Sequence, residues 1–379
     1  MTKHDSKGGL LKEIEQGIAN LDQWQKKAAV ETPDGPQRVR GLAGSGKTVV
    51  LTLKAAYLHS RHPDWDIAIT FYTHALYQQL KDLIRRFSFE HTNDEPNWER
   101  LRFLHAWGGQ KQDDVYTELA DHANVIPRDF LYEKSRYGMD DAFKGICHEL
   151  VEQTNLTSGP PIYDAVLIDE AQDLPPGFFR LVYRFTKEPK RIIWAYDELQ
   201  TLSESVTTRR SCSARTRRVS HWSSSTTRLG DPVKTSYIPM CCRNSPWALS
   251  LAHALGFWIY RQPGLVQHFD DPLLWEEVGY QVLGGTLEPG VKVSIKRKPT
   301  SYPSYFTKFL KPTDATVSVS FPSELEQAEW IAEAIRENLD QDELEADDIL
   351  IVLPAPLTAR NDAAVIRDAH CTARHRNRI

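Results

Sequence analysis

The chain has 379 residues, of which 41% are hydrophobic and 26% charged, and its formal net charge is −5. These values fit a globular protein of about two or three domains and exclude a surface that is basic throughout, although they leave room for a local basic groove. No apolar run approaches the length of a membrane span, and the five cysteines form neither a C-x-x-C pair nor a metal-binding spacing with histidine. We therefore expect a cytoplasmic protein with reduced cysteines and no membrane partner.

Residues 1–36 form the first predicted segment, which is helical. Apolar residues recur at helical spacing from Leu11 to Leu21, and a second helical turn follows. Gln25 lies in this turn, upstream of a glycine-rich loop. Its spacing from that loop is equally typical of a glutamine on a helix surface and of one that contacts a ligand.

The glycine-rich loop at residues 41–48 has the sequence GLAGSGKT, which fits the phosphate-binding pattern G-x-x-x-x-G-K-[ST]. A short strand is predicted over 37–40 and a helix over 49–58, and this context weakens the alternative of a glycine turn before an ordinary helix. The glycines let backbone N–H groups surround an anion, and the helix adds the positive end of its dipole. Lys47 is placed to reach the β- and γ-phosphates of ATP and Thr48 to ligate Mg²⁺. The residues predicted to hold the nucleotide are Gly41, Gly44, Ser45, Gly46, Lys47 and Thr48.

Strands and helices alternate from residue 37 to residue 202, which predicts a parallel sheet covered by helices on both faces. Four apolar residues over 165–168 run directly into Asp169 and Glu170, as in a central strand whose carboxylates lie at the carboxyl edge of the sheet. The other elements predicted here are strands over 66–72, 101–109 and 191–196, helices over 74–87 and 178–185, and a helical insert over 110–160.

Hydrolysis of a phosphoanhydride by such a loop requires a carboxylate for Mg²⁺ and a group that orients or deprotonates the attacking water. Asp169 and Glu170 supply both, unless they are simply an exposed acidic pair at the end of a strand. Gln200 ends the next strand, where its amide can sense the γ-phosphate. Arg243 follows a predicted strand over 236–242 and is either an arginine finger from a second domain or an ordinary surface arginine.

Residues 203–234 form a predicted linker whose composition differs from that of the rest of the chain. Its stretch over 207–228 is rich in Ser, Arg and Thr and contains no acidic residue. Three interpretations of this stretch stay open. It is a basic, disordered loop that binds nucleic acid, it is a solvated insertion, or it is a stretch read out of frame.

Residues 235–379 are predicted to form a second, incomplete α/β core. Its predicted elements are helices over 246–260 and 324–339 and strands over 291–296, 315–321 and 348–353. The last stretch, over 368–379, is again rich in Arg and His and has no apolar period.

The order of these motifs resembles that of the superfamily 1 helicases of the UvrD/Rep type, and the resemblance covers nearly all of the chain. The matching stretches are Gln25, GLAGSGKT, TFYTHAL, FLHAWG, LIDEAQDL, AYDELQ and CRNSPW. The resemblance implies a P-loop NTPase with two RecA-like cores. ATP would bind between the cores, and single-stranded DNA or RNA would run across them.

The resemblance also implies a role for each matching residue. Gln25 would read the adenine, and Asp169 would hold Mg²⁺ together with Thr48. Glu170 would activate the water, Gln200 would couple the γ-phosphate to the nucleic acid, and Arg243 would be the finger. The residues implied to contact nucleic acid through stacking and phosphate hydrogen bonds are Thr70, Phe71, Thr73, His105 and Trp107. Core packing is an equal alternative for Phe71 and Trp107.

The sequence departs from the family in several ways. After Gln200 the family continues with ordered aromatic residues, whereas here a run rich in Ser, Arg and Thr begins within a few residues. Cys242 stands where the family has a tyrosine that stacks on the base. The last two helicase motifs have no counterpart, and residues 1–10 are typical of the interior of a longer protein. We therefore expect a missing upstream or downstream domain.

The resemblance favours an ATP-dependent helicase or translocase that closes its cleft on ATP and reopens it on hydrolysis. Two alternatives stay open. One is a truncated remnant that binds ATP without unwinding, which the missing motifs and the atypical segments over 207–228 and 368–379 motivate. The other is a P-loop regulatory module with no nucleic-acid role, against which the DEAQD sequence counts.

Overall fold

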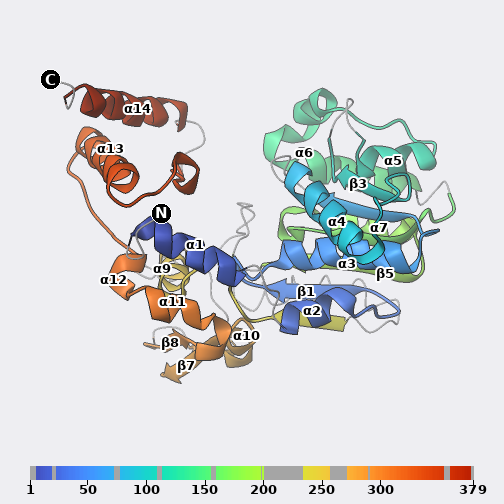
Figure 1. Ribbon diagram of the computed structural model, residues 1–379. Coiled ribbons are helices and arrows are strands. Elements are labelled where there is room, and N and C mark those ends of the chain that lie inside the picture. Colours follow the sequence, from blue (N-terminus) through green and yellow to red (C-terminus); the bar gives the residue numbers. More distant parts are fainter. Residues whose placement is uncertain are drawn as a thin grey trace. The chain divides into compact units, whose positions relative to one another are not determined.

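Figure 1 shows a computed structural model of the chain. The structure describes residues 6–18, 23–71, 77–108, 113–154, 159–197, 199, 234–256, 271–288, 291–353 and 359–376. The chain divides into two compact units. Residues 21–303 form the larger unit, and residues 1–20 with 304–379 form the smaller one.

The larger unit is built on a six-stranded sheet with the strand order β3-β2-β4-β5-β1-β6. Every neighbouring pair in this sheet is parallel, so the carboxyl ends of all the strands meet at one edge. This confirms the predicted α/β class and its parallel sheet. The strands are β1 (Gln37–Gly41), β2 (Ile67–Phe71), β3 (Leu101–His105), β4 (Tyr163–Ile168), β5 (Thr186–Tyr196) and β6 (Lys234–Ile238).

Helices cover both faces of this sheet, because successive strand residues point to opposite sides (Figure 1). On β4, Val166 and Ile168 pack in one apolar cluster with α5, α6 and α7, whereas Ala165 and Leu167 pack in a second cluster with α2, α3 and α4. The helices are α2 (Gln23–Val30), α3 (Lys47–Arg61), α4 (Tyr77–Thr92), α5 (Val115–His122), α6 (Phe130–Thr154) and α7 (Pro176–Phe185). Among the described residues, no helix is both long and apolar enough to cross a membrane.

The chain after β6 packs against the loop that follows β1. Leu42 of that loop is buried in a third apolar cluster with Cys241, Leu249 and Trp275. β7 and β8 pair antiparallel in this region. Its elements are α9 (Pro246–Gly256), α10 (Pro272–Glu277), β7 (Tyr280–Gly284), β8 (Ser294–Arg297) and η3 (Pro299–Ser301).

The smaller unit is helical in its described part. The start of α1 is held by the residues that follow α13, since Ser6 Oγ donates a hydrogen bond to Glu343 Oε2 over 2.6 Å and Gly8 N–H donates to Asp342 O over 2.9 Å. A Cβ atom on Gly8 would lie 2.3 Å from Glu343 O, so only glycine fits this contact. The helices are α1 (Lys7–Ile18), α11 (Ser304–Phe309), α12 (Pro312–Ala315), α13 (Glu324–Asp340), η4 (Ala346–Asp348) and α14 (Ala359–Arg376).

Two strands predicted for a second core are wrong. Residues 316–321 and 349–353 run without strand pairing, and the described part of the smaller unit offers them no neighbouring strand. Most of their apolar side chains are exposed, with Val317 at 69% and Leu350 at 85%. The apolar pattern is typical of a strand, but a strand forms only where another strand satisfies its backbone groups.

We predict that Leu167→Ala, in the buried strand β4, lowers the free energy of unfolding by about 2–5 kcal/mol, because it removes packed apolar atoms and leaves a cavity. Leu131→Ala is the matched control, since the Leu131 side chain is 76% exposed and its truncation should change stability by less than about 0.5 kcal/mol. Denaturant unfolding measures both. Equal effects of the two substitutions would contradict the placement of β4 in the core.

Candidate functional site

The loop after β1 has the strand–loop–helix context that the sequence predicted. β1 ends at Gly41 and α3 begins at Lys47. Gly44 and Gly46 both have left-handed backbone conformations, with φ of +77° and +83°. A side chain there would be strained in its backbone, and a Cβ atom on Gly46 would also lie 2.5 Å from Gln25 Nε2. The two glycines are therefore required by the turn that aims the loop at the start of α3.

Lys47 is folded back onto this loop. Its side chain is almost completely buried, and its Nζ donates hydrogen bonds to Gly41 O over 3.0 Å and to Leu42 O over 3.2 Å. The same Nζ lies 3.8 Å from Asp197 Oδ2, at the end of β5. A buried ammonium beside backbone amides is an arrangement that binds phosphate.

Thr48 and Asp169 join the loop to the end of β4. Thr48 Oγ1 donates a 2.8 Å hydrogen bond to Asp169 Oδ2. Asp169 is 2% exposed, and its Oδ1 has no hydrogen-bond partner among the residues that the structure describes. A buried carboxylate oxygen that lacks a donor, next to a threonine hydroxyl, fits the oxygen ligands that Mg²⁺ prefers.

The environment of Asp169 disfavours its ionised form in the absence of a cation. Burial, followed by the neighbouring Glu170 carboxylate, raises the pKa of Asp169 from 3.8 to about 6. The hydrogen bond from Thr48, the charge of Lys47 and a hydrogen bond from the Glu170 backbone oppose this rise. A divalent cation would remove the cost by neutralising the carboxylate.

Glu170 is held in an unusual conformation directly after Asp169. Its backbone is left-handed, with φ of 46° and ψ of 47°, a region that is uncommon for residues other than glycine. Its Oε2 accepts a 2.5 Å hydrogen bond from Gln172 Nε2. Such strain persists only where surrounding contacts hold it, and it concentrates at functional sites.

Gln25 contacts the glycine loop directly. Its side chain is 4% exposed, and its Nε2 donates a 2.8 Å hydrogen bond to Ser45 O. Of the two interpretations left open by the sequence, the structure therefore excludes a glutamine on the helix surface. The contact that it describes is with the loop backbone.

The segment that carries Arg243 lies against the same loop. The N–H groups of Cys242 and Arg243 donate to Gly44 O over 3.0 and 3.3 Å, and Asn244 Nδ2 donates to Ala43 O over 3.0 Å. The Arg243 side chain itself is exposed. The structure therefore brings Arg243 to the loop by its backbone and leaves its guanidinium on the surface.

The residues implied to contact nucleic acid are mostly buried. Thr70 and Phe71 are 0% and 1% exposed, and the Phe71 ring packs against Phe103 with ring centroids 4.8 Å apart. His105 is 5% exposed, whereas Trp107 is half-buried and stacks on Phe143 at 5.4 Å. Phe71 is thus a core residue in this conformation. Thr73 and Gln200 lie outside the described residues, as does the stretch over 207–228.

Sequence reasoning did not assign roles to three residues that the structure places at this site, namely Asp197, Gln172 and Asn244. Asp197, like Asp169, follows a predicted strand, and ligands bind at the carboxyl ends of the strands in parallel sheets. Gln172 lies within the DEAQD sequence, but no spacing rule indicates its partners. Asn244 contacts the loop through a fold that brings it across 201 positions of sequence.

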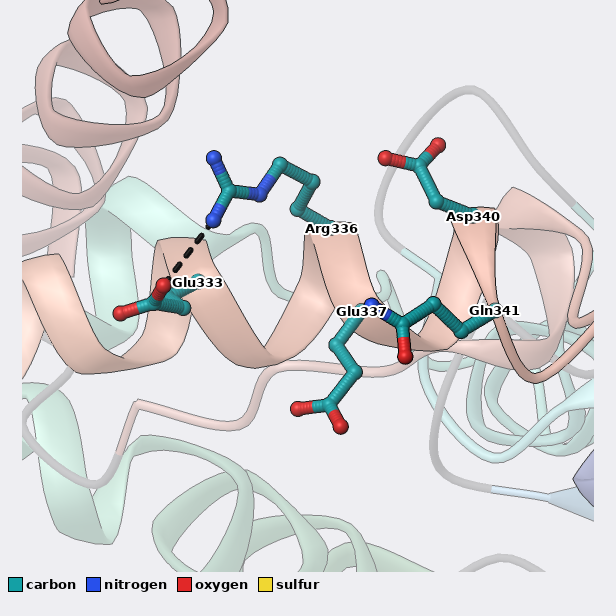
Figure 2. Close-up of a pocket in the computed structure, with 5 residues that line it drawn as sticks. All are labelled: Glu333, Arg336, Glu337, Asp340 and Gln341. Carbon is teal, nitrogen blue, oxygen red and sulfur yellow. Dashed lines mark hydrogen bonds and ion pairs between the residues drawn. The ribbon is translucent and has the colours of Figure 1, made fainter. Parts of the chain in front are cut away.

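A shallow hollow of about 150 Å³ lies on α13 of the smaller unit (Figure 2). It is lined by Glu333, Arg336, Glu337, Asp340 and Gln341. Four of them lie on α13 and Gln341 directly follows it, and the dashed line in Figure 2 is a 2.9 Å ion pair between Arg336 and Glu333 within that helix. The Glu337 and Asp340 side chains point away from one another. The hollow lacks convergent polar groups and is a surface depression.

No protein-family model matches the sequence, and comparison with curated proteins finds no match. The assignment of the site therefore rests on its own geometry and residue types.

We predict that the stability of the metal-free protein depends on pH through Asp169. Its folded pKa lies above its unfolded value, so the folded state binds more protons between about pH 4 and 6 and stability falls as pH rises through this range. A difference of about two between the pKa values corresponds to about 3 kcal/mol. The Asn side chain of Asp169→Asn can still accept from Thr48 but does not ionise. The stability of this variant relative to the unmodified protein should therefore rise by up to this amount as the pH is raised from about 4 to about 6.

Denaturant unfolding of both proteins in EDTA, at about pH 4 and at about pH 6, measures this difference in stability. Asp64→Asn is the matched control, since Asp64 is exposed. A stability difference between Asp169→Asn and the unmodified protein that stays constant with pH would contradict the buried position of the carboxylate.

Proposed function

We propose that the chain binds ATP with Mg²⁺ at residues 41–48 and hydrolyses it, and that hydrolysis drives movement on single-stranded DNA or RNA, as in the superfamily 1 helicases that its motifs resemble. The observation that carries the proposal is the contact between Thr48 Oγ1 and the buried carboxylate of Asp169, which has one oxygen without a partner in the described structure. This contact joins the two halves that an ATP-hydrolysing P-loop requires.

The residues around this contact have separate tasks. Lys47 would exchange its bonds to the carbonyls of Gly41 and Leu42 for bonds to the phosphates. Mg²⁺, held by Thr48 and Asp169, would neutralise charge on the phosphate oxygens. Glu170 would accept the proton of the attacking water, because its carboxylate lies next to Asp169 and is only partly buried.

Arg243 supports the proposal because it supplies a second cationic side chain, beside Lys47, next to the glycine loop. Its backbone hydrogen bond to Gly44 O fixes the start of its side chain beside the phosphate loop, while its exposed guanidinium is free to turn toward a bound nucleotide. An arginine so placed stabilises charge on the transferred phosphoryl group.

The nucleic-acid part of the proposal rests on the positions of strand ends. Thr70 and His105 lie at the carboxyl ends of neighbouring strands, at the edge of the sheet that also carries the glycine loop. Trp107 follows β3 at this edge and is the one aromatic residue of the implied set with part of its side chain accessible. Stacking of bases on such a ring is tolerant of sequence, as translocation requires.

A second candidate function is nucleotide binding without strand separation. The unpaired segments over 316–321 and 349–353 favour it, because they are the strands that a second core would need. In that case ATP would bind and turn over at the first sheet without driving movement.

We predict that Lys47→Ala and Glu170→Gln separate binding from turnover. Lys47→Ala should weaken ATP binding by at least about tenfold, because it removes the buried cation. Glu170→Gln should keep the affinity for ATP and lower turnover by about 10²-fold or more, because it removes the base. Lys26→Ala, at an exposed position of α2, is the control for loss of a lysine.

Calorimetric titration and phosphate release measure these two quantities. If Glu170→Gln lost affinity as severely as Lys47→Ala, the division of roles between the two residues would be wrong.

We predict that the purified chain binds single-stranded oligonucleotides and that the affinity falls steeply as salt is added. Trp107→Ala should weaken this binding by about 5- to 100-fold, whereas Trp107→Phe, which retains a ring, should weaken it less. Filter binding with DNA and RNA oligomers measures both. Absence of binding at low salt would favour a regulatory module with no nucleic-acid role.

A further inference from the structure

A closed ring of contacts surrounds the start of α3. On one side Thr48 donates to Asp169, and Glu170 follows in the chain. On the other side Lys47 lies 3.8 Å from Asp197 Oδ2. Gln172 closes the ring through both ends of its amide.

The two bonds of Gln172 use different atoms of the same amide. Its Nε2 donates to Glu170 Oε2 over 2.5 Å, and its Oε1 accepts from the backbone N–H of Asp197 over 3.1 Å. A side-chain amide carries a donor and an acceptor at separate ends, so it can donate to a carboxylate at one end and accept from an N–H at the other. Neither a glutamate nor an apolar side chain of this length can make both bonds.

We propose that Gln172 is a positioning residue for ATP hydrolysis, which holds the Glu170 carboxylate and ties its position to the end of β5, where Asp197 faces Lys47. This inference rests on the proposed function, since Glu170 is the base only if the chain hydrolyses ATP. Gln172 itself would touch neither the nucleotide nor the attacking water.

The backbone of Glu170 explains why such a residue is needed. Because Glu170 is left-handed and begins a short 3-10 helix over 171–173, the direct continuation of β4 does not fix where its side chain points. The donor on Gln172 therefore selects one orientation of the carboxylate. Misplacement of a base by about 1 Å can cost about 10²-fold in rate.

The link to Asp197 adds a second consequence. Phosphate that draws Lys47 away from Gly41 and Leu42 also changes the surroundings of Asp197, whose backbone holds Gln172. The position of the base then responds to occupancy of the phosphate site. If Gln172 only held two loops together, its substitution would lower stability and nucleotide affinity instead of the rate of hydrolysis.

Two substitutions of Gln172 test the proposal in the full chain. Gln172→Met keeps the length of the side chain and removes both bonds. Gln172→Glu keeps the acceptor for Asp197 N–H and replaces the donor with a carboxylate that repels Glu170. Gln78→Met is the matched control, because Gln78 is exposed on α4 and its amide donates a hydrogen bond to the exposed Asp82.

Steady-state kinetics with Mg²⁺ and ATP give the first readout. Gln172→Met and Gln172→Glu should each lower kcat by about 10- to 100-fold while KM for ATP stays within about twofold, and Gln78→Met should change neither. A kcat of Gln172→Met within twofold of the unmodified chain overturns the proposal. A rise in KM with kcat retained also overturns it, because that result indicates a structural role in the phosphate site.

Amide hydrogen exchange at Asp197 gives the second readout and does not depend on turnover. Exchange at this N–H should speed up in Gln172→Met and stay slow in Gln172→Glu, because only the latter keeps the acceptor. Equal exchange rates of the Asp197 N–H in the two variants would overturn the proposal that Gln172 links Glu170 to the backbone of Asp197.

The two proposals fail in different ways. An unmodified chain that binds ATP and releases no phosphate overturns the hydrolase proposal and the positioning role together. Normal turnover that Gln172→Met leaves intact overturns the positioning role alone.

Discussion

The hydrogen bond from Thr48 to Asp169 is the contact on which the rest of the site depends. It spans 2.8 Å between the first turn of α3 and the end of β4, and it lies beside a carboxylate oxygen that has no partner in the described structure. Burial makes that carboxylate costly to ionise and raises its pKa to about 6. The fold thus keeps an acid in a place where it is unfavourable without a cation, which is more typical of a functional site than of a stabilising contact.

The parallel sheet explains how distant parts of the sequence reach this contact. β1, β4 and β5 are adjacent in the order β4-β5-β1, so the residues that follow them meet at one edge. Asp169 and Asp197 directly follow β4 and β5, and Lys47 begins the helix that the loop after β1 leads into. β6 brings Arg243 to the same edge, and the third apolar cluster holds Leu42 against the chain that follows β6. The loop that would bind phosphate is therefore fixed from both of its sides.

Much of this site was predictable, because the residues that form it follow strong local patterns. A run of apolar residues ending in Asp169, and a glycine loop between a strand and a helix, indicate their positions without tertiary information. The partners of Gln172 and Asn244 were not predictable, since they depend on how loops meet across the sheet edge. For Phe71 a local motif was misleading. The motif suggests base stacking, but Phe71 lies on a buried strand and its ring packs in the core. The strands predicted over 315–321 and 348–353 failed because apolar alternation does not reveal whether a neighbouring strand is present.

The measurement that tests the central claim most directly is phosphate release from ATP by the purified chain, with Mg²⁺ or with EDTA, each with and without single-stranded oligonucleotides. The account predicts release that requires Mg²⁺ and rises when single strands are added. Binding of ATP with no release in any of these conditions would contradict it.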